Sequence, residues 1–216
     1  MENLKQIYQK RFDNEIYFRQ KMWKILCNNF FQKYVPKISI VLDIACGYCE
    51  FLNNIDAKKK IGIDLNPDSK LYANSDVEVI IGGANNMQTI KDESIDVIFV
   101  SNFFEHITKE KIIETIKEIR RALKKNGKLL ILQPNIRYCY KDYWMFFDHI
   151  TPIDDRALIE VLEINGFKII DCKSKFLPFT TKSRFPKSFF LLKVYLFIPI
   201  LHKIFGQQSF IYAEKI

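Results

Sequence analysis

The fold is decided by residues 41–50, which read VLDIACGYCE, and by residues 61–64, which read IGID. Each apolar run ends in a carboxylate, Asp43 in the first and Asp64 in the second, and small residues follow the first. In a doubly wound sheet, a spacing of about twenty residues places two such acids at the carboxyl ends of neighbouring strands, where they flank a nucleoside-sized crevice. The identity of the nucleoside therefore decides the function.

Further strand-like runs recur along the chain, with helical patterns between them. Short, continuous apolar runs are typical of strands that are covered on both faces. Alternating strands and helices predict an α/β fold with a mostly parallel sheet. The expected strands are 39–45, 60–65, 77–82, 95–101, 128–133, 167–174 and 209–214, and the expected helices lie within 3–34, 107–125 and 154–165.

The length of 216 residues suits a single domain over residues 1–216. We expect an N-terminal helical lid (1–36), a core (37–176), an insertion (177–207) and a last strand (208–216). The insertion contains a basic loop and then an apolar stretch, 189–205, which is too short and too interrupted to span a bilayer. Two interpretations stay open for it: packing on the sheet or in a homodimer, and peripheral contact with an anionic membrane.

The formal net charge is +8, but the lysines are dispersed along the chain and do not form one basic arm. The odd number of cysteines, five, argues for a reducing compartment, and the charged N-terminus shows no apolar signal segment. These features predict a cytoplasmic protein, with the inner face of the membrane as the place of any lipid contact.

Three kinds of nucleotide ligand compete for the crevice. A phosphate-binding P-loop requires Gly-x4-Gly-Lys-Ser/Thr, which the sequence lacks. A dinucleotide fingerprint starting at Ala45 would place Glu50 near a helix N-terminus, where its carboxylate would repel the diphosphate. A phosphate-free cofactor fits better. Asp43 can face a cationic amino-acid end, Gly47 lets the backbone approach a ribose, and Asp64 can accept from both ribose hydroxyls.

Residues 38–135 resemble the class I S-adenosylmethionine-dependent methyltransferases. The first turn of that family usually reads Asp-x-Gly-x-Gly-x-Gly, and here Ala45 and Cys49 replace two of the glycines. Four further stretches match in order: the ribose-binding strand end (63–67), the adenine loop (82–87), the fourth strand with its turn (94–106) and the turn before the fifth strand (123–129). The adenine loop usually carries Asp where Gly83 stands, so adenine recognition would rest on Ala84 and Asn85.

The resemblance implies a Rossmann-like, doubly wound sheet of seven strands, mostly parallel with an antiparallel last strand. It also implies S-adenosyl-L-methionine as the cofactor, bound by Asp43, Ala45, Gly47, Cys49, Asp64, Leu65, Ala84, Asn85, Asn102 and Phe103. Residues 143–152 and 176–183 resemble a bacterial subgroup associated with polysaccharide or glycolipid biosynthesis.

A rival interpretation concerns Cys46 and Cys49. A Cys-x-x-Cys at a strand-to-helix turn is also the pattern of a thioredoxin-like redox site, but that short fold would leave the motifs after Asp64 unexplained. The alternative is that both cysteines are small apolar residues chosen for fit. The spacing of the cysteines and histidines matches no zinc motif, so no metal site is predicted.

Two histidines are candidate catalytic residues. His149 follows an aromatic loop after the fifth strand, and Asp148 beside it could orient the ring as a base or an acceptor ligand. His106 follows the fourth strand, where capping of the next helix is the structural alternative. Residues Asn135, Arg137 and Trp144 are the candidate acceptor-binding groups, with Arg137 suited to an acidic or phosphorylated acceptor.

The expected reaction is methyl transfer to a small-molecule acceptor, sugar-like or lipid-linked, at oxygen. The net charge suggests a nucleic-acid (RNA) methyltransferase as an alternative. However, amino-methylating nucleic-acid enzymes usually carry Asn/Asp-Pro-Pro-Tyr after the fourth strand, and here Phe-Phe-Glu follows Asn102. A further alternative is a non-catalytic S-adenosylmethionine-binding protein.

Overall fold

A computed structural model describes residues 15–179 and 188–216. Its centre is a seven-stranded sheet in the order β3-β2-β1-β4-β5-β7-β6. β7 runs antiparallel to β5 and β6, and the other paired strands are parallel, which confirms the predicted fold class. The strands are β1 (Ile40–Ile44), β2 (Lys59–Asp64), β3 (Val77–Ile81), β4 (Ile95–Ser101), β5 (Leu123–Pro134), β6 (Phe167–Lys173) and β7 (Gln208–Lys215).

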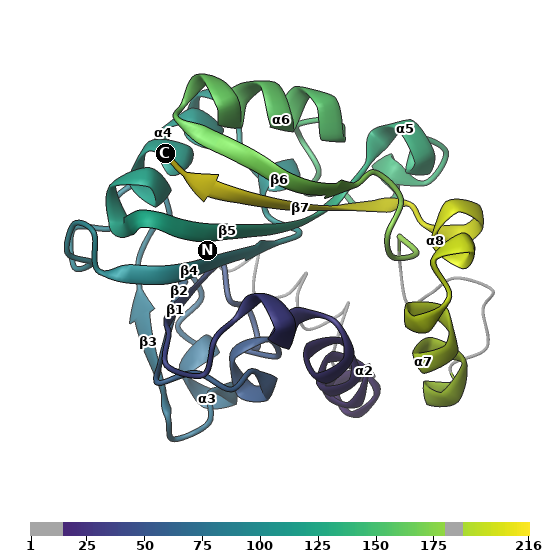
Figure 1. Ribbon diagram of the computed structural model, residues 1–216, viewed down its shortest axis with the longest axis horizontal. Coiled ribbons are helices and arrows are strands. Elements are labelled where there is room, and N and C mark those ends of the chain that lie inside the picture. Colours follow the sequence, from purple (N-terminus) through teal and green to yellow (C-terminus); the bar gives the residue numbers. More distant parts are fainter. Residues whose placement is uncertain (1–14, 180–187) are drawn as a thin grey trace.

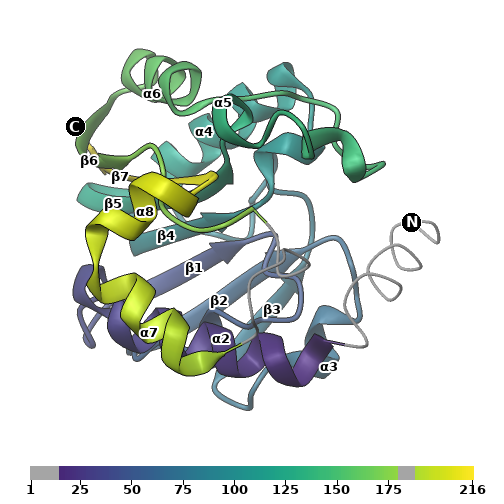
Figure 2. The same ribbon diagram turned by 90° about the vertical axis from the view of Figure 1, so that its right-hand side faces the viewer.

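Helices cover both faces of the sheet (Figure 1). α4 and α6 lie on one face, while α2 and α7 lie on the other and run side by side (Figure 2). The α-helices are α2 (Ile16–Asn29), α3 (Ser69–Tyr72), α4 (Lys109–Ala122), α5 (Ile136–Cys139), α6 (Asp155–Ile164), α7 (Phe189–Phe197) and α8 (Pro199–Phe205), and the 3₁₀ turns are η2 (Phe31–Tyr34), η3 (Leu52–Asn54), η4 (Phe104–His106) and η5 (Tyr143–Met145). Part of the expected lid, residues 1–14, lies outside the described residues, as does the basic part of the insertion, 180–187.

The side chains of the central strands alternate between two cores, because successive strand residues point to opposite faces. Leu42 and Ile44 of β1 join the core beneath α4 and α6. Val41 joins the aromatic-rich core beneath α2. Asp43 is two residues after Val41, and Ser101 of β4 is two residues after Phe99, so each points to the same face as that apolar residue. Both polar side chains therefore lie on the α2 face, at the carboxyl edge of the sheet.

One sequence prediction needs correction. The helix expected to run to residue 125 ends at Ala122, because Leu123 already pairs with Ile95 in the sheet. The dinucleotide and redox alternatives both require a helix after the turn that follows β1, but residues 45–58 contain only the single 3₁₀ turn η3. The connection between β1 and β2 is therefore short, and α2 and α7 cover the face that it leaves open.

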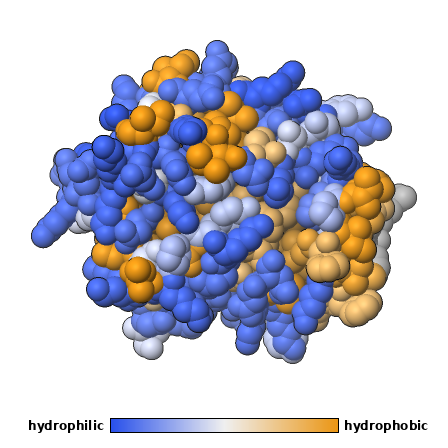
Figure 3. Space-filling model, in the orientation of Figure 1, coloured by the Kyte–Doolittle hydropathy of each residue, from blue (hydrophilic) through white to orange (hydrophobic). Residues whose placement is uncertain are grey.

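The insertion forms two helices that break at Ile198–Pro199. α7 packs along α2, and the rings of Phe18 and Phe189 stack with centroids 5.3 Å apart. The outer sides of α7 and α8 are apolar, as the right-hand side of Figure 3 shows, with Phe190, Phe197, Ile200 and Ile204 each more than half exposed. Among the described helices, none combines the length and the apolar character needed to cross a bilayer.

Candidate functional site

The turn after β1 has an unusual backbone conformation. Ala45, Gly47 and Cys49 have φ values of 56°, 52° and 57°. Glycine adopts this left-handed region without strain, whereas a residue with a Cβ does so at a cost of about 1 kcal/mol. The backbone N–H groups of Gly47 and Asn66 donate to the two carboxylate oxygens of Asp64, each over 2.8 Å. Asp64 therefore ties the turn to the end of β2.

Asp43 is buried beside this turn. Burial raises the pKa of its carboxyl well above the usual range, and the neighbouring Cys49, Asp64 and Glu50 raise it further. No lysine or arginine of the described residues forms an ion pair with Asp43 to offset this. A cationic ligand group beside Asp43 would stabilise its charged form.

A cavity of about 410 Å³ opens next to Asp43 on the α2 face of the sheet. This volume lies in the range of small-ligand sites. Its polar wall follows the carboxyl edge across β1 and β4 and contains Asp43, Glu50, Ser101, Asn102, Glu105, His106 and His149. Its apolar wall comes from α2, α7 and α8 and contains Phe18, Met22, Trp23, Leu191, Leu192, Tyr195, Leu201 and Phe205.

An ion pair links α2 to the turn after β1. Arg19 Nε lies 2.6 Å from Glu50 Oε1, and both side chains are largely buried and line the cavity. Arg19 lies in the N-terminal segment, 1–36, that the sequence predicts as a helical lid. The pair fixes α2 against the cofactor turn, so that helix forms a wall of the cavity.

The structure brings four of the expected cofactor residues into the cavity lining: Asp43, Ala45, Gly47 and Asn102. Asp64 lies directly behind the turn. Cys49 is buried, with its Sγ 3.8 Å from Cys46 Sγ, and Asn85 donates to Glu114 over 2.9 Å. The remaining expected contacts, Leu65, Ala84 and Phe103, lie outside the cavity lining, and their roles in binding adenosine stay predictions.

The two histidines meet at the acceptor side of the cavity. Their ring centroids are 4.9 Å apart, although His106 follows β4 and His149 follows η5. His149 is enclosed by Tyr143, Phe146 and Phe179. His106 Nδ1 lies 3.0 Å from the backbone oxygen of Asp148, so it contacts the loop that carries His149. It does not cap the next helix, because the N-cap of α4 is Thr108, whose side chain accepts from the N–H of Lys111.

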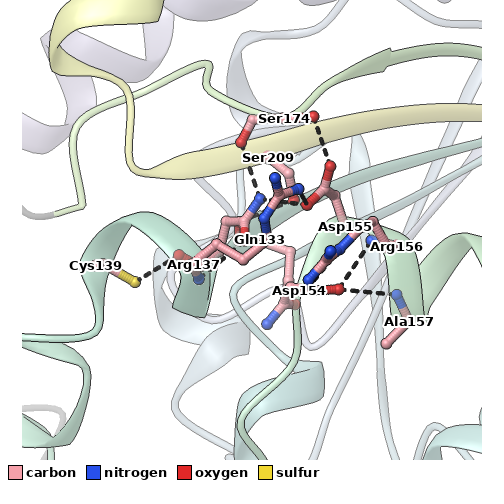
Figure 4. Close-up of polar contacts among 10 residues, drawn as sticks. Gln133, Arg137, Cys139, Asp154, Asp155, Arg156, Ala157, Ser174 and Ser209 are labelled. Atoms are coloured by element: carbon pink, nitrogen blue, oxygen red, sulfur yellow. Dashed lines mark hydrogen bonds and ion pairs between the residues drawn. The ribbon is translucent and has the colours of Figure 1, made fainter.

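The three expected acceptor-binding residues lie elsewhere. Asn135 is buried and donates to Asp155 Oδ1 and to the backbone oxygen of Ser174, and Arg137 Nη1 lies 3.0 Å from Asp155 Oδ1. Figure 4 shows Arg137 and Ser174 directed toward Asp155, which joins the end of β5 to the start of α6 and the end of β6. Trp144 is exposed on its loop. None of the three lines the cavity, so an acceptor role for them stays a prediction.

The cysteine pair does not have the properties of a redox site. Such a site needs a lowered thiol pKa, usually at a helix N-terminus. Here the hydrogen bond from Cys49 and burial both raise the pKa of Cys46, and only a 3₁₀ turn follows. Both thiols are buried and reduced.

Sequence reasoning missed two groups that line the cavity. Glu105 stood beside His106 in the quoted motif but was assigned no role, although a carboxylate next to a histidine after the fourth strand is a recognisable signal. The second group is the inner face of α7 and α8. Its residues Leu191, Tyr195 and Leu201 recur at roughly helical spacing, but the pattern does not reveal that they reach the cavity.

Residues 42–131 match the family model described as a methyltransferase domain. An S-adenosylmethionine-dependent methyltransferase from Archaeoglobus fulgidus superimposes with a TM-score of 0.68 and 25% identity, covering 94% of this chain and 99% of that one. The chain carries an S-adenosylmethionine-dependent methyltransferase domain. Its cofactor is S-adenosylmethionine.

Two other proteins extend this comparison. A methyltransferase from Thermotoga maritima shares the fold, with a TM-score of 0.66 and 19% identity over 97% of this chain and 98% of that one. An uncharacterized protein of Methanocaldococcus jannaschii is 28% identical over 140 residues, or 64% of this chain. The match spans 60% of that relative's length.

Proposed function

We propose that this methyltransferase domain transfers the methyl group of S-adenosylmethionine to an oxygen of a small acceptor, sugar-like or lipid-linked. The observation that carries the proposal is the shared cavity: the cofactor turn with Asp43 forms one part of its wall, and Glu105, His106 and His149 form another. An acceptor hydroxyl beside the histidines would therefore lie in the same enclosed space as the sulfonium end of the cofactor.

The chemistry asked of the protein is modest. The acceptor oxygen attacks the methyl carbon in line, the carbon–sulfur bond breaks, and its electron pair stays on sulfur to give S-adenosylhomocysteine. The sulfonium already activates the methyl group, so the protein mainly supplies position and a dry environment. A hydroxyl must also lose its proton, and a histidine base contributes about 10²–10⁴-fold to such a step.

The apolar wall favours an acceptor with an apolar part. Leu191, Leu192 and Phe205 come from the insertion that also carries the exposed apolar surface, so one side of the cavity adjoins that surface. A lipid-linked sugar would place its polar part at the histidines and its apolar part along α7 and α8. This arrangement supports the association with polysaccharide or glycolipid synthesis better than it supports RNA.

Transfer of radiolabelled methyl groups to a panel of acceptors tests the proposal. The panel contains sugars, lipid-linked sugars, phenols, amines and RNA. Label on a hydroxyl of a sugar or lipid-linked acceptor is expected. Transfer to RNA alone would replace the proposal by the nucleic-acid alternative, and binding of S-adenosylhomocysteine without transfer to any acceptor would favour a non-catalytic protein.

Asp64→Ala should weaken the binding of S-adenosylhomocysteine by about 10- to 100-fold, because hydrogen bonds to a charged partner contribute about 1.5–3 kcal/mol each. Isothermal titration calorimetry measures the loss, and circular dichroism shows whether the fold survives. The control is Asp56→Ala, which removes an exposed partner of Lys37 at the amino end of β2. Equal affinities for wild type and Asp64→Ala would remove Asp64 from the cofactor site.

We also propose that α7 and α8 bind the surface of an anionic membrane. Phe197 is 87% exposed, and a groove between α2 and α7 is lined by Lys21, Lys24 and Lys193 together with Phe190. Apolar side chains flanked by lysines are typical of helices that lie in a bilayer interface.

Co-sedimentation with vesicles containing phosphatidylserine tests this proposal. Phe197→Ser should weaken vesicle binding at least about tenfold, given about 1.5–3 kcal/mol for burying a Phe side chain. Leu71→Ser, at an 80% exposed position on α3, is the control and should bind as wild type does. Absence of vesicle binding, together with a concentration-dependent dimer that Phe197→Ser dissociates, would assign the surface to a homodimer.

A further inference from the structure

Glu105, His106 and His149 form a compact set of donor atoms at the acceptor side of the cavity. One ligand-type atom from each lies within 4.8 Å of the others. Glu105 and His149 are 1% and 7% exposed, so these donors face the cavity and not bulk water. Glu105 and His106 are separated from His149 by more than forty residues, which explains why no sequence spacing predicted the set.

The backbone holds the two segments together. The N–H groups of Ile150 and Thr151 both donate to the backbone oxygen of Glu105, over 2.9 and 3.1 Å. The hydroxyl of Thr151 donates to the backbone oxygen of Ile107 over 2.6 Å, and that of Tyr143 donates to the backbone oxygen of Thr151. The three donor side chains are therefore anchored by structure that does not depend on any ligand.

Contacts behind the donors orient them. His106 Nδ1 donates to the backbone oxygen of Asp148 over 3.0 Å, which leaves the lone pair on Nε2. Nε2 lies 3.7 Å from Glu105 Oε1, and Glu105 Oε2 accepts from the buried side chain of Gln133 over 2.9 Å. His106 Nε2 and Glu105 Oε1 thus face each other with lone pairs, and a hydrogen bond at the other polar atom of each side chain holds it in place. Metal-binding histidines and carboxylates usually have such a second hydrogen bond.

Because both atoms carry lone pairs, a proton or a metal ion is needed between His106 Nε2 and Glu105 Oε1. Within the described residues, no lysine or arginine pairs with Glu105. A proton on His106 would satisfy two atoms, whereas a metal ion would also use the ring nitrogen of His149. Tetrahedral ligands at about 2.0–2.1 Å from a metal lie about 3.3 Å apart, so small side-chain rotations would bring the three atoms into place.

We propose that Glu105, His106 and His149 bind a divalent transition-metal ion of the zinc type, with an open coordination position facing the cavity. Two imidazoles and one carboxylate suit zinc, iron(II) or manganese and do not suit magnesium or calcium. Resting on the proposed function, the ion takes the place of the histidine base described there: it binds the acceptor hydroxyl and favours loss of its proton to solvent. The resulting oxygen anion attacks the methyl carbon, and sulfur keeps the electron pair of the broken bond.

Metal binding can be measured without any acceptor. The full chain is treated with a chelator, dialysed and titrated with Zn²⁺ by calorimetry and with Co²⁺ by absorption spectroscopy. We expect one equivalent of Zn²⁺ and the intense Co²⁺ absorption of a four- or five-coordinate site, with no binding of Mg²⁺. Glu105→Gln and His149→Phe should each weaken Zn²⁺ binding at least about 100-fold.

Two controls decide the site of binding. Cys49→Ala removes a thiol of the cysteine pair and should leave Zn²⁺ affinity unchanged. His202→Gln removes the remaining histidine of the chain and should do the same. No bound metal in wild type, unchanged affinity in Glu105→Gln and His149→Phe, or loss in Cys49→Ala would overturn the proposal.

The same preparations separate this inference from the proposed function. S-adenosylhomocysteine affinity, measured on chelator-treated wild type and on each variant, reports the cofactor site and the fold. If the chelator-treated protein binds S-adenosylhomocysteine and still transfers methyl groups at the full rate, the metal proposal falls and the methyltransferase function stands. If S-adenosylhomocysteine does not bind to wild type, the proposed function falls, whether or not Zn²⁺ binds.

Discussion

Replacing His149 by Phe should lower the turnover number for methyl transfer by about 10²-fold or more, in the range that a positioned base contributes. The affinity for S-adenosylhomocysteine should not change. Phe fills the space between Tyr143, Phe146 and Phe179 that the imidazole occupies, so the aromatic packing is kept while both ring nitrogens are lost. The variant therefore separates the chemistry of His149 from its packing.

The matched control is Phe147→Ala on the same loop. Phe147 is 93% exposed and does not line the cavity, so its removal should leave the turnover number near that of wild type. Turnover is measured as S-adenosylhomocysteine release with the acceptor that the radiolabel screen identifies. A turnover number for His149→Phe within about threefold of wild type, well below the expected contribution, would exclude His149 from the reaction.

The fold was predictable because its signals are local. Each parallel strand appears as a short apolar run. The polar residues Asp43 and Ser101, at the ends of β1 and β4, indicate that the site forms at the carboxyl edge of the sheet. Gly166, with φ 81°, follows the end of α6, which lies within one residue of the predicted end at 165. The error at α4 arose because Asn126-Gly127 resembles a helix C-terminus, while the pairing of Leu123 with Ile95 is decided by a strand far away in the sequence.

The site was predictable in part, for the same reason. The turn residues Ala45 and Gly47 are adjacent in sequence to the strand that positions them. The acceptor side is assembled from a turn after β4, a loop after η5 and two helices of the insertion, and no local pattern reports how these meet. Asn135 and Arg137 were expected at the site because they follow β5. The unpredicted partner is Asp155, which holds both of them away from the cavity.

The contacts of Asp155 also predict a large loss of stability. Asp155→Asn should lower the free energy of unfolding by about 3 kcal/mol near pH 7, because a buried carboxylate is replaced by a group that presents N–H to existing donors. The carboxylate of Asp155 accepts from Asn135, Arg137 and Ser174 and is 3% exposed. Urea denaturation followed by circular dichroism measures the loss.

The adjacent Asp154→Asn is the control. Asp154 caps α6 by accepting from the backbone N–H groups of Arg156 and Ala157, and Asn caps a helix about as well as Asp. The substitution also weakens the ion pair of Asp154 with Arg156, whose side chain is exposed, and exposed pairs contribute about 0–1 kcal/mol. The free energy of unfolding of Asp154→Asn should therefore fall by no more than about 1 kcal/mol. Equal losses for the two variants would show that the cost comes from the start of α6 in general and not from the buried contacts of Asp155.

The pH dependence of the same measurement identifies the charge as the cause. Burial works to raise the pKa of Asp155, but the hydrogen bonds from Ser174, Asn135 and Arg137 lower it below the usual value. A carboxyl whose pKa is lower in the folded state stabilises the fold fully above its unfolded pKa, about 3.9, and loses that contribution as the pH falls through the folded value. The difference between wild type and Asp155→Asn should thus be constant from about pH 7 to about pH 5 and shrink below about pH 4. A difference that does not change down to about pH 2 would mean that shape, and not the ionised carboxylate, holds β5, α6 and β6 together.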